Sequence, residues 1–342
     1  MKQGPGRVAS ILLCIMVLSV GVLDSREYGR EFRQNPNALM DVVAGTANAP
    51  AQYRIGVVDS AYFLARHGHL ALGHVLTVLD VLSGLTAVFV LFWVFRRSMV
   101  YRSARLTAQW FGAACFLILI QFYLGWVIWY QRPETLPTAA IVAMALMLLT
   151  VRLPLSRSAV AVAAIGGMLL LAVAQGYVRA DVAVALHAGI LLVCLTRLGS
   201  GFALGRGLQA GTSLVAMALA GGIQYDLMRR VFPHASYGET PVLQLFLNLQ
   251  APSTQLPFFL FLVPLGWTAV TLMRRRYRVD SADAAVFAGA VIFMGIWLLV
   301  GRIKEVRIFL PFALALVPLT VELAMQRFLP ERGGIEQDPV SA

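Results

Sequence analysis

Long apolar runs separated by short polar connectors make up most of this 342-residue chain. A helix needs about 20 apolar residues to cross the hydrocarbon core of a bilayer, and most of the runs approach that length. The pattern predicts an all-α protein, a polytopic transmembrane helix bundle of about ten spans with extracytoplasmic loop helices. The predicted spans are residues 8–23, 71–95, 106–130, 136–151, 159–177, 182–196, 208–225, 256–273, 284–300 and 308–325.

The first apolar run resembles a signal peptide in outline, because Lys2 and Arg7 precede it. No A-x-A cleavage site follows the run, so we expect it to remain in the protein as the first helix. Residues 1–330 then form a single integral-membrane domain. Residues 331–342 form a cytoplasmic tail whose composition predicts disorder.

Two connectors are longer than the others, residues 24–70 and residues 226–255. The first begins with a predicted helix at residues 25–33, which we expect to lie on the membrane with Tyr28 and Phe32 toward the lipid. The alternative is an ordinary interfacial helix with internal ion pairs. The second contains residues 242–249, an apolar stretch too short to span that is predicted to form an interfacial helix. Two such loops could cap one cavity.

The distribution of charge orients the predicted bundle. The sequences RRSMVYRSAR and RRRYR lie on one side of it, whereas the connectors on the other side mix Arg, Asp, Glu, Tyr and His. The positive-inside rule places the basic side in the cytoplasm, together with both termini. We therefore expect a multi-pass protein of the plasma (inner) membrane whose chemistry faces outward.

Composition excludes other classes of protein. With 59% hydrophobic and 13% charged residues, the chain has too little polar surface for a soluble globule. The net charge of +11 does not indicate nucleic-acid binding, because the arginines are spread over many connectors and form no single patch. The three cysteines lie far apart in apolar segments, so they form neither a disulfide framework nor a metal site.

Asp24 stands where the first apolar run meets the long loop. A carboxylate held there, partly desolvated at the level of the lipid headgroups, is suited to accept a proton from a hydroxyl that attacks a lipid-linked phosphate donor. Asp24 is therefore the candidate catalytic residue. The alternative is that Asp24 ends one helix and caps the next one.

Basic groups at two outer positions are candidate binding sites for a phosphate. One group precedes the last predicted span and contains Lys304, Glu305 and Arg307; the other lies in the second long loop and contains Arg229 and Arg230. Arginine binds phosphate bidentately, and lysine acts as a point charge. The alternative for both groups is anchoring to lipid headgroups.

Two acids lie within predicted spans, and three histidines lie close together. We expect Asp80 to form a hydrogen bond between helices and Glu322 to lie at the membrane interface. His67, His69 and His74 invite a metal interpretation, but residues two apart on a helix point to different faces and no Cys or acid completes the set. We predict no metal site and no cofactor.

The two ends of the chain resemble the GT-C type of membrane glycosyltransferases and their short bacterial relatives. The features that carry the resemblance are the acid Asp24 after the first helix, the Pro50, Tyr53 and Arg54 segment, and the sequence KEVRIFLP before the last span. The sequence differs from many members in having Ser25 directly after Asp24, where they carry a second acid. The middle of the chain resembles the family in topology only.

The resemblance implies a lipid-linked sugar donor of the polyprenyl-phosphate type and an acceptor on the outer side. It implies that Asp24 is the base and that Arg54, Lys304 and Arg307 contact the donor phosphate. Tyr53, Glu305, Arg229 and Arg230 are further candidates for substrate binding. Membrane lipids are the other expected partner, and no nucleic acid is expected.

Other functions remain open. A polysaccharide polymerase or an acyltransferase of envelope biogenesis fits about ten spans, although an acyltransferase should carry a histidine motif that is missing here. A non-catalytic membrane assembly partner or a transporter comes from a different class. A transporter should show Gly- or Pro-broken helices in corresponding halves, whereas the middle helices are nearly featureless.

Overall fold

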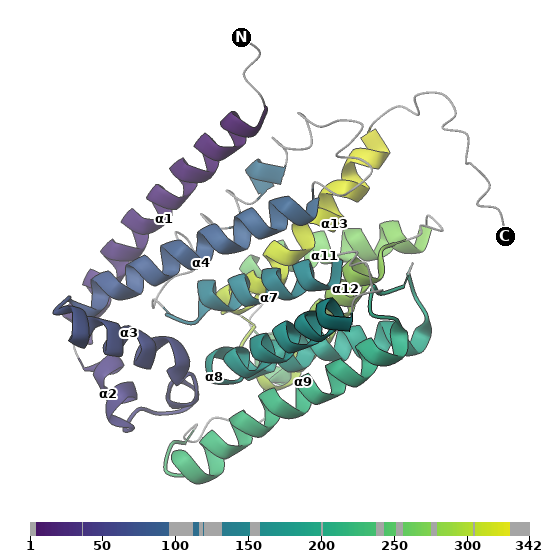
Figure 1. The fold of residues 1–342 in the computed structure, drawn as a ribbon. Helices are drawn as coiled ribbons and strands as arrows, with labels where there is room; N and C mark the ends of the chain where they lie inside the picture. Colours follow the sequence, from purple (N-terminus) through teal and green to yellow (C-terminus); the bar gives the residue numbers. More distant parts are fainter. Residues whose placement is uncertain are drawn as a thin grey trace, which may run out of the picture.

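The computed structural model describes residues 5–35, 37–95, 112–115, 119, 132–150, 158–199, 201–236, 243–250, 256–274, 279–303 and 305–328. Within these ranges every regular element is a helix (Figure 1). The α-helices are α1 (Pro5–Gln34), α2 (Ala38–Ala44), α3 (Ile55–Gly68), α4 (Leu72–Phe95), α7 (Thr135–Thr150), α8 (Ser158–Thr196), α9 (Arg206–Asp226), α10 (Leu245–Gln250), α11 (Leu256–Arg274), α12 (Ser281–Val300) and α13 (Leu310–Phe328). Short 3-10 helices, η1 (Ala51–Tyr53) and η4 (Val306–Phe309), and the π-helix η2 (Leu227–Val231) complete them.

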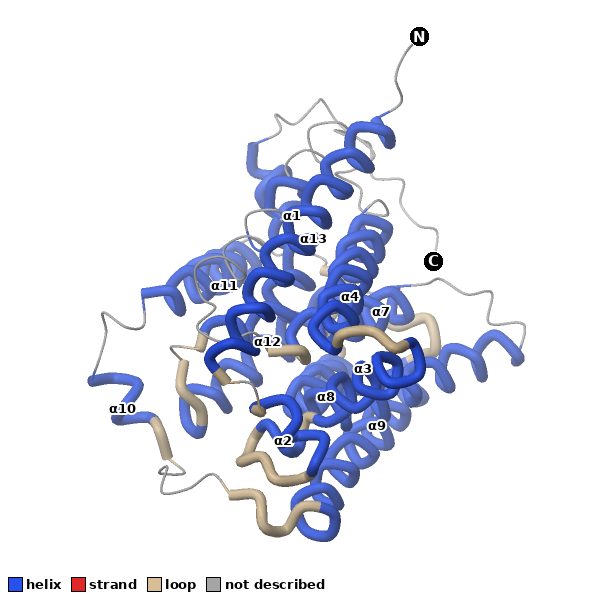
Figure 2. Tube along the Cα trace, turned by 90° about the vertical axis from the view of Figure 1, so that its left-hand side faces the viewer, coloured by secondary structure: helices blue, strands red, loops and turns tan. Residues whose placement is uncertain are grey.

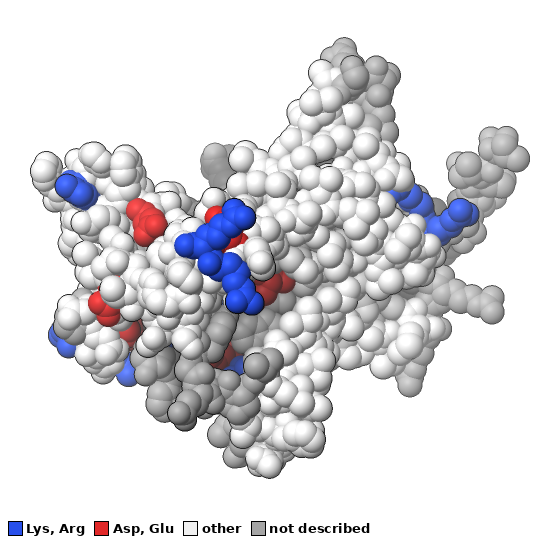
Figure 3. Space-filling model, turned by 90° about the horizontal axis from the view of Figure 1, so that it is seen from below, with Lys and Arg blue, Asp and Glu red and all other residues white. Residues whose placement is uncertain are grey.

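Four helical segments in this part of the chain are long and apolar enough to cross a membrane. They are Leu72–Phe95, Ala159–Thr196, Ser281–Val300 and Arg307–Ala324. The surface seen from below carries few charges: small groups of charged side chains lie among residues that are mostly uncharged (Figure 3). These findings indicate an integral membrane protein.

Most of the predicted helices are confirmed within a few residues, because apolar length and helical period are local properties of the sequence. Three predicted features lie outside the described residues: most of the span at 106–130, the basic RRSMVYRSAR cluster and the tail at 331–342. Most of the RRRYR cluster lies outside them as well.

The first helix departs from the prediction. α1 runs without interruption through Asp24 to Gln34, so the predicted helix at 25–33 continues the first apolar run and is not a separate helix. Tyr28 is buried, and Phe32 packs against Gly73 of α4. No proline occurs between Gly6 and Asn35, and the aromatic row packs on the protein.

The helix α8 contains two segments that run in opposite directions. Helical backbone geometry is lost at Arg179, between the two spans predicted at 159–177 and 182–196. Before the break, Gly167 lies beside Leu148 near the end of α7. After the break, Asp181 accepts a hydrogen bond from Trp297 near the end of α12, and Gly199 lies beside Ser281 at the start of α12. The second segment is therefore antiparallel to α12, with Arg179 at the tip of a helical hairpin.

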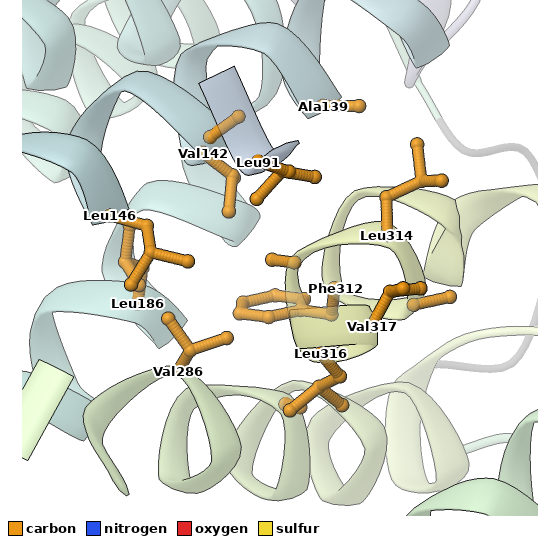
Figure 4. Close-up of a cluster of buried hydrophobic side chains, with 14 of the residues drawn as sticks. Leu91, Ala139, Val142, Leu146, Leu186, Val286, Phe312, Leu314, Leu316 and Val317 are labelled. Carbon is orange, nitrogen blue, oxygen red and sulfur yellow. The ribbon is translucent and has the colours of Figure 1, made fainter. Parts of the chain in front are cut away.

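The last helix is the centre of the bundle. Phe312 of α13 points into a cluster of aliphatic side chains from α4, α7, α8 and α12 (Figure 4). Phe312 and Leu314 are fully buried. The short η4 turn that precedes α13 packs against α11 and α12 through Phe309, and its Ile308 carbonyl accepts a hydrogen bond from Arg179 at the break in α8.

Two ends of the bundle can be distinguished. The start of α1 and the end of α13 lie at one end, and α2 and α3 lie at the opposite end (Figure 1). The helix α3 of the first long loop packs on the tip of the α8 hairpin, where Gly56 contacts Tyr177. The end that carries α2 and α3 is called the loop end below.

Candidate functional site

Three pairs of an arginine and an acid meet at the loop end. Each pair lies in a turn that opens or breaks a helix: Arg132 and Glu134 before α7, Arg179 and Asp181 at the break in α8, and Glu305 and Arg307 before α13. Arg54, which precedes α3, joins them. These seven residues are called the arginine–carboxylate cluster, and if all are ionised the four guanidiniums exceed the three carboxylates by one charge.

Arg54 and Glu134 form the contact between the first loop and α7. The Arg54 guanidinium donates a hydrogen bond of 2.8 Å to Glu134 Oε1, and the side chains are 16% and 9% exposed. Burial alone would raise the pKa of the Glu134 carboxyl, but Arg54 and Arg132 hold that pKa below its ordinary value. Glu134 is therefore a carboxylate at neutral pH.

Arg179 is the most enclosed member of the cluster, with a side chain that is 1% exposed. Its guanidinium donates two hydrogen bonds to Asp181 and one to the Ile308 carbonyl, and it lies over the rings of Phe293 and Trp297. Trp297 also donates its indole N–H to Asp181. A planar guanidinium can make these contacts simultaneously because its donors are coplanar and its face stacks on aromatic rings.

Arg307 connects the last turn with the rest of the cluster. Its guanidinium lies 2.7 Å from Glu305 Oε2, and the two side chains are 9% and 41% exposed. Glu134, Arg132 and Arg54 are also close enough for their charges to act on Arg307. Residues from four separate turns thus share one electrostatic environment.

Asp24 lies beside this cluster in a second polar group. Asp24, Tyr28 and Asp80 are all buried. The Tyr28 hydroxyl donates a hydrogen bond of 2.8 Å to Asp80 Oδ2, which confirms the predicted bond between helices at Asp80. Asp80, Asp24 and Glu134 are all close enough for their charges to act on the Tyr28 phenol. The Asp24 group and the cluster are therefore adjacent.

The position of Asp24 corrects one prediction. The carboxylate is not partly exposed as predicted, because Asp24 is 0% exposed and stands inside the continuous helix α1. For the same reason Asp24 neither ends a helix nor caps the next one. The uninterrupted helix places Asp24 one turn before Tyr28, which its charge influences and which forms the hydrogen bond to Asp80 on α4.

The other predicted binding residues are placed differently. Tyr53 is buried between the two long loops and donates a hydrogen bond of 2.5 Å to the Ala235 carbonyl. Arg229 and Arg230 are exposed, and Arg230 pairs with Asp226 one turn earlier. Lys304 lies outside the described residues. Of the predicted phosphate contacts, the structure brings Arg54 and Arg307 together.

The two long loops contact each other directly. The His234 Nε2 atom lies 2.6 Å from the Gly45 carbonyl oxygen, and Phe232 packs on Gly45. The Ala49 backbone N–H donates to Ser236 O. These contacts join the loops directly, and Tyr53 contributes to the same contact with its hydrogen bond to Ala235.

Sequence reasoning missed Arg132, Glu134, Arg179 and Asp181 as site residues. A signal for them was present, because R-P-E, R-A-D and E-V-R each place an arginine and an acid two positions apart in a short connector on the same side of the predicted bundle. One such connector does not indicate a site, because an arginine and an acid are common in short connectors. The same spacing in three connectors on one side of the bundle is the pattern that indicates a shared site.

The arrangement suits a ligand that carries phosphate. Guanidiniums bind phosphate oxygens bidentately, and carboxylates beside them can orient the guanidiniums or accept a proton. Among the described residues no group of three or more His, Cys, Asp or Glu side chains is placed to hold a metal ion. His67, His69 and His74 are exposed.

Comparison of the chain with protein-family models, with curated proteins and with solved structures finds no match.

Proposed function

We propose that the protein is a membrane glycosyltransferase of the GT-C type that transfers a sugar from a polyprenyl-phosphate donor to an acceptor on the extracytoplasmic side. The observation that carries the proposal is the convergence of Arg54 and Arg307 with two further arginines beside Asp24. Residues from the two ends of the chain thus meet at one place. A lipid-borne phosphate needs such a group of cations.

The proposed topology has ten spans with both termini in the cytoplasm. It is supported by the basic inner connectors and by the positions of the chain ends, since the start of α1 and the end of α13 lie at the same end of the bundle (Figure 1). An even number of spans requires this arrangement. The break at Arg179 supports counting α8 as two spans.

In the proposed reaction, the oxygen of the acceptor hydroxyl attacks the anomeric carbon of the sugar. The bond between that carbon and the phosphate oxygen breaks, and the proton of the hydroxyl passes to Asp24. Arg54 and Arg307 neutralise the polyprenyl phosphate that leaves, so the leaving group needs little help from an acid. The proposal invokes no metal and no cofactor.

The burial of Asp24 adds a requirement to the proposal. A fully buried carboxylate meets an acceptor only after neighbouring side chains move, so donor binding must open the site. The carboxylates of Asp181 and Glu305 are more accessible, with side chains 29% and 41% exposed. They are the alternative bases if Asp24 does not act.

The test uses purified protein in phospholipid vesicles with radiolabelled undecaprenyl-phosphate hexoses, supplied one at a time, and a bacterial envelope extract as the source of the acceptor. We expect the wild type to release undecaprenyl phosphate and Asp24→Asn to lose that activity while inserting and expressing normally. The matched control is Asp41→Asn, which changes an exposed acid in the same loop and should retain activity.

The results separate the parts of the proposal. Full activity in Asp24→Asn shows that the base assignment is wrong, and loss of activity in Asp181→Asn or Glu305→Gln then identifies the acid that acts. If the wild type neither consumes nor binds any polyprenyl-phosphate sugar, the glycosyltransferase proposal fails. A non-catalytic partner or a transporter then becomes the better interpretation.

A further inference from the structure

Hydrogen bonds from its polar side hold the short helix α10 against the end of α12 that lies at the loop end. The Asn248 amide donates hydrogen bonds of 2.9 Å and 2.8 Å to the carbonyls of Leu298 and Gly301, and its oxygen accepts one of 3.3 Å from the Ile303 N–H. The Gln244 backbone N–H donates to the Leu299 carbonyl at 2.7 Å. These bonds fix which side of α10 faces the protein.

The opposite side of α10 is apolar and uncovered. Leu243, Phe246, Leu247 and Leu249 are 53%, 67%, 47% and 63% exposed. A helix on a soluble protein packs its apolar side inward and turns its polar side to water. α10 does the reverse, and residues 243–250 carry no charge.

The apolar side of α10 continues a surface that faces lipid. α12 is one of the segments that is long and apolar enough to cross a membrane, and it exposes Ile296, Leu299 and Val300 in its last turns. The bonds from Gln244 and Asn248 hold α10 next to these turns. Figure 2 shows α10 at the margin of the bundle, apart from α2 and α3.

We propose that α10 docks on the bilayer, with Phe246 and Leu249 in the hydrocarbon of the leaflet nearest the loop end. Asn248 holds the helix in this orientation. The Asn248 side chain also forms hydrogen bonds with the backbone of Gly301 and Ile303, and these residues precede the turn that carries Glu305 and Arg307. The arginine–carboxylate cluster is thereby tied to the membrane surface through α10.

A protein partner fits this surface less well than lipid. Stable protein interfaces bury about 1,000 Å² or more and include hydrogen bonds at a polar rim. A six-residue helix offers a smaller area, and the polar side chain at its centre is already bonded within the chain. Hydrocarbon requires neither a large area nor hydrogen bonds.

Photo-crosslinking tests the proposal, and it does not require the removal of the three native cysteines. The photoreactive residue p-benzoylphenylalanine replaces Phe246 in the full chain, which is reconstituted in dioleoylphosphatidylcholine vesicles and illuminated. We expect a phospholipid adduct at position 246 by mass spectrometry. The control carries the same residue in place of Thr46, an exposed loop residue, and should give at least tenfold less adduct.

Other outcomes overturn the proposal. A crosslink between two copies of the chain shows that protein covers α10, and equal adduct yields at positions 246 and 46 show that the side is solvated. If the change at position 246 prevents folding, the same residue at position 249 gives the same test. Asn248→Ala should lower the adduct yield at position 246 severalfold, and an unchanged yield contradicts the role of Asn248.

Discussion

Arg54 and Glu134 lie 80 positions apart in the sequence, but the Arg54 guanidinium lies 2.8 Å from Glu134 Oε1 in the structure. Their ion pair joins the first long loop to the start of α7 and brings a carboxylate to the centre of four arginines. The loop is therefore part of the bundle at this point, and the properties of the cluster depend on this contact.

Replacing Glu134 by glutamine should destabilise the folded protein at neutral pH by about 1–3 kcal/mol, because buried guanidiniums lose a charged acceptor. Thermal unfolding in detergent, followed by intrinsic fluorescence, measures the change. Asp41→Asn removes an exposed acid and should alter stability by less than about 0.5 kcal/mol.

The pH dependence of the Glu134→Gln effect is part of the same prediction. The folded-state pKa of Glu134 is lowered from 4.5, so its stabilising contribution is fully present above the unfolded-state pKa near 4.5 and is lost as the pH falls through the lower folded-state value. The stability difference between wild type and variant should be constant near pH 7 and shrink below pH 4.5. A difference that grows on acidification would contradict the assignment.

Tyr28→Phe removes the hydroxyl that bonds Asp80 across α1 and α4. The buried Asp80 carboxylate loses a donor, and we expect a loss of about 1–3 kcal/mol in unfolding experiments. Tyr225→Phe, at a residue 63% exposed, is the control and should be nearly neutral. Equal stabilities for the two variants would show that the hydrogen bond contributes little.

Arg179→Lys keeps the positive charge at the tip of the α8 hairpin but loses the planar group that bonds Asp181 and the Ile308 carbonyl. We expect destabilisation by about 1–3 kcal/mol, and by about 3–5 kcal/mol for Arg179→Ala. Arg230→Lys changes an arginine that is 80% exposed and should have little effect. A stable Arg179→Lys would mean that charge alone is sufficient at this position.

Gly189→Ala tests the close crossing of α8 and α12. A Cβ atom at position 189 would overlap the Ala285 carbonyl oxygen and the Gly289 nitrogen, so the backbones must separate. We expect a loss of about 1–3 kcal/mol or more. Gly166→Ala is the control, since a Cβ there meets nothing within 4 Å and alanine favours the helix. If both variants are equally stable, the crossing is more adaptable than the structure indicates.

Local features of the fold could be predicted from the sequence. The helix boundary at Asn35 follows from the helix-breaking sequence Asn-Pro-Asn that begins there. The change of direction between residues 177 and 182 follows from the end of an apolar run. Each depends on neighbouring residues only. The continuity of α1 through Asp24 was missed because a charged stretch after an apolar run suggests an interface, whereas the hydrogen bond between Tyr28 and Asp80 shows that helix packing continues beyond Asp24.

By itself the sequence determined the helical class, the apolar length of the spans and the charged character of the turns, because composition and period suffice for these properties. Only the tertiary structure decided which turns meet. Arg179 contacts Ile308 across 129 positions, and α13 must lie at the centre of the bundle for that contact to form. Helix period reports which side of a helix is apolar, but the partner of that side depends on the packing of the whole chain.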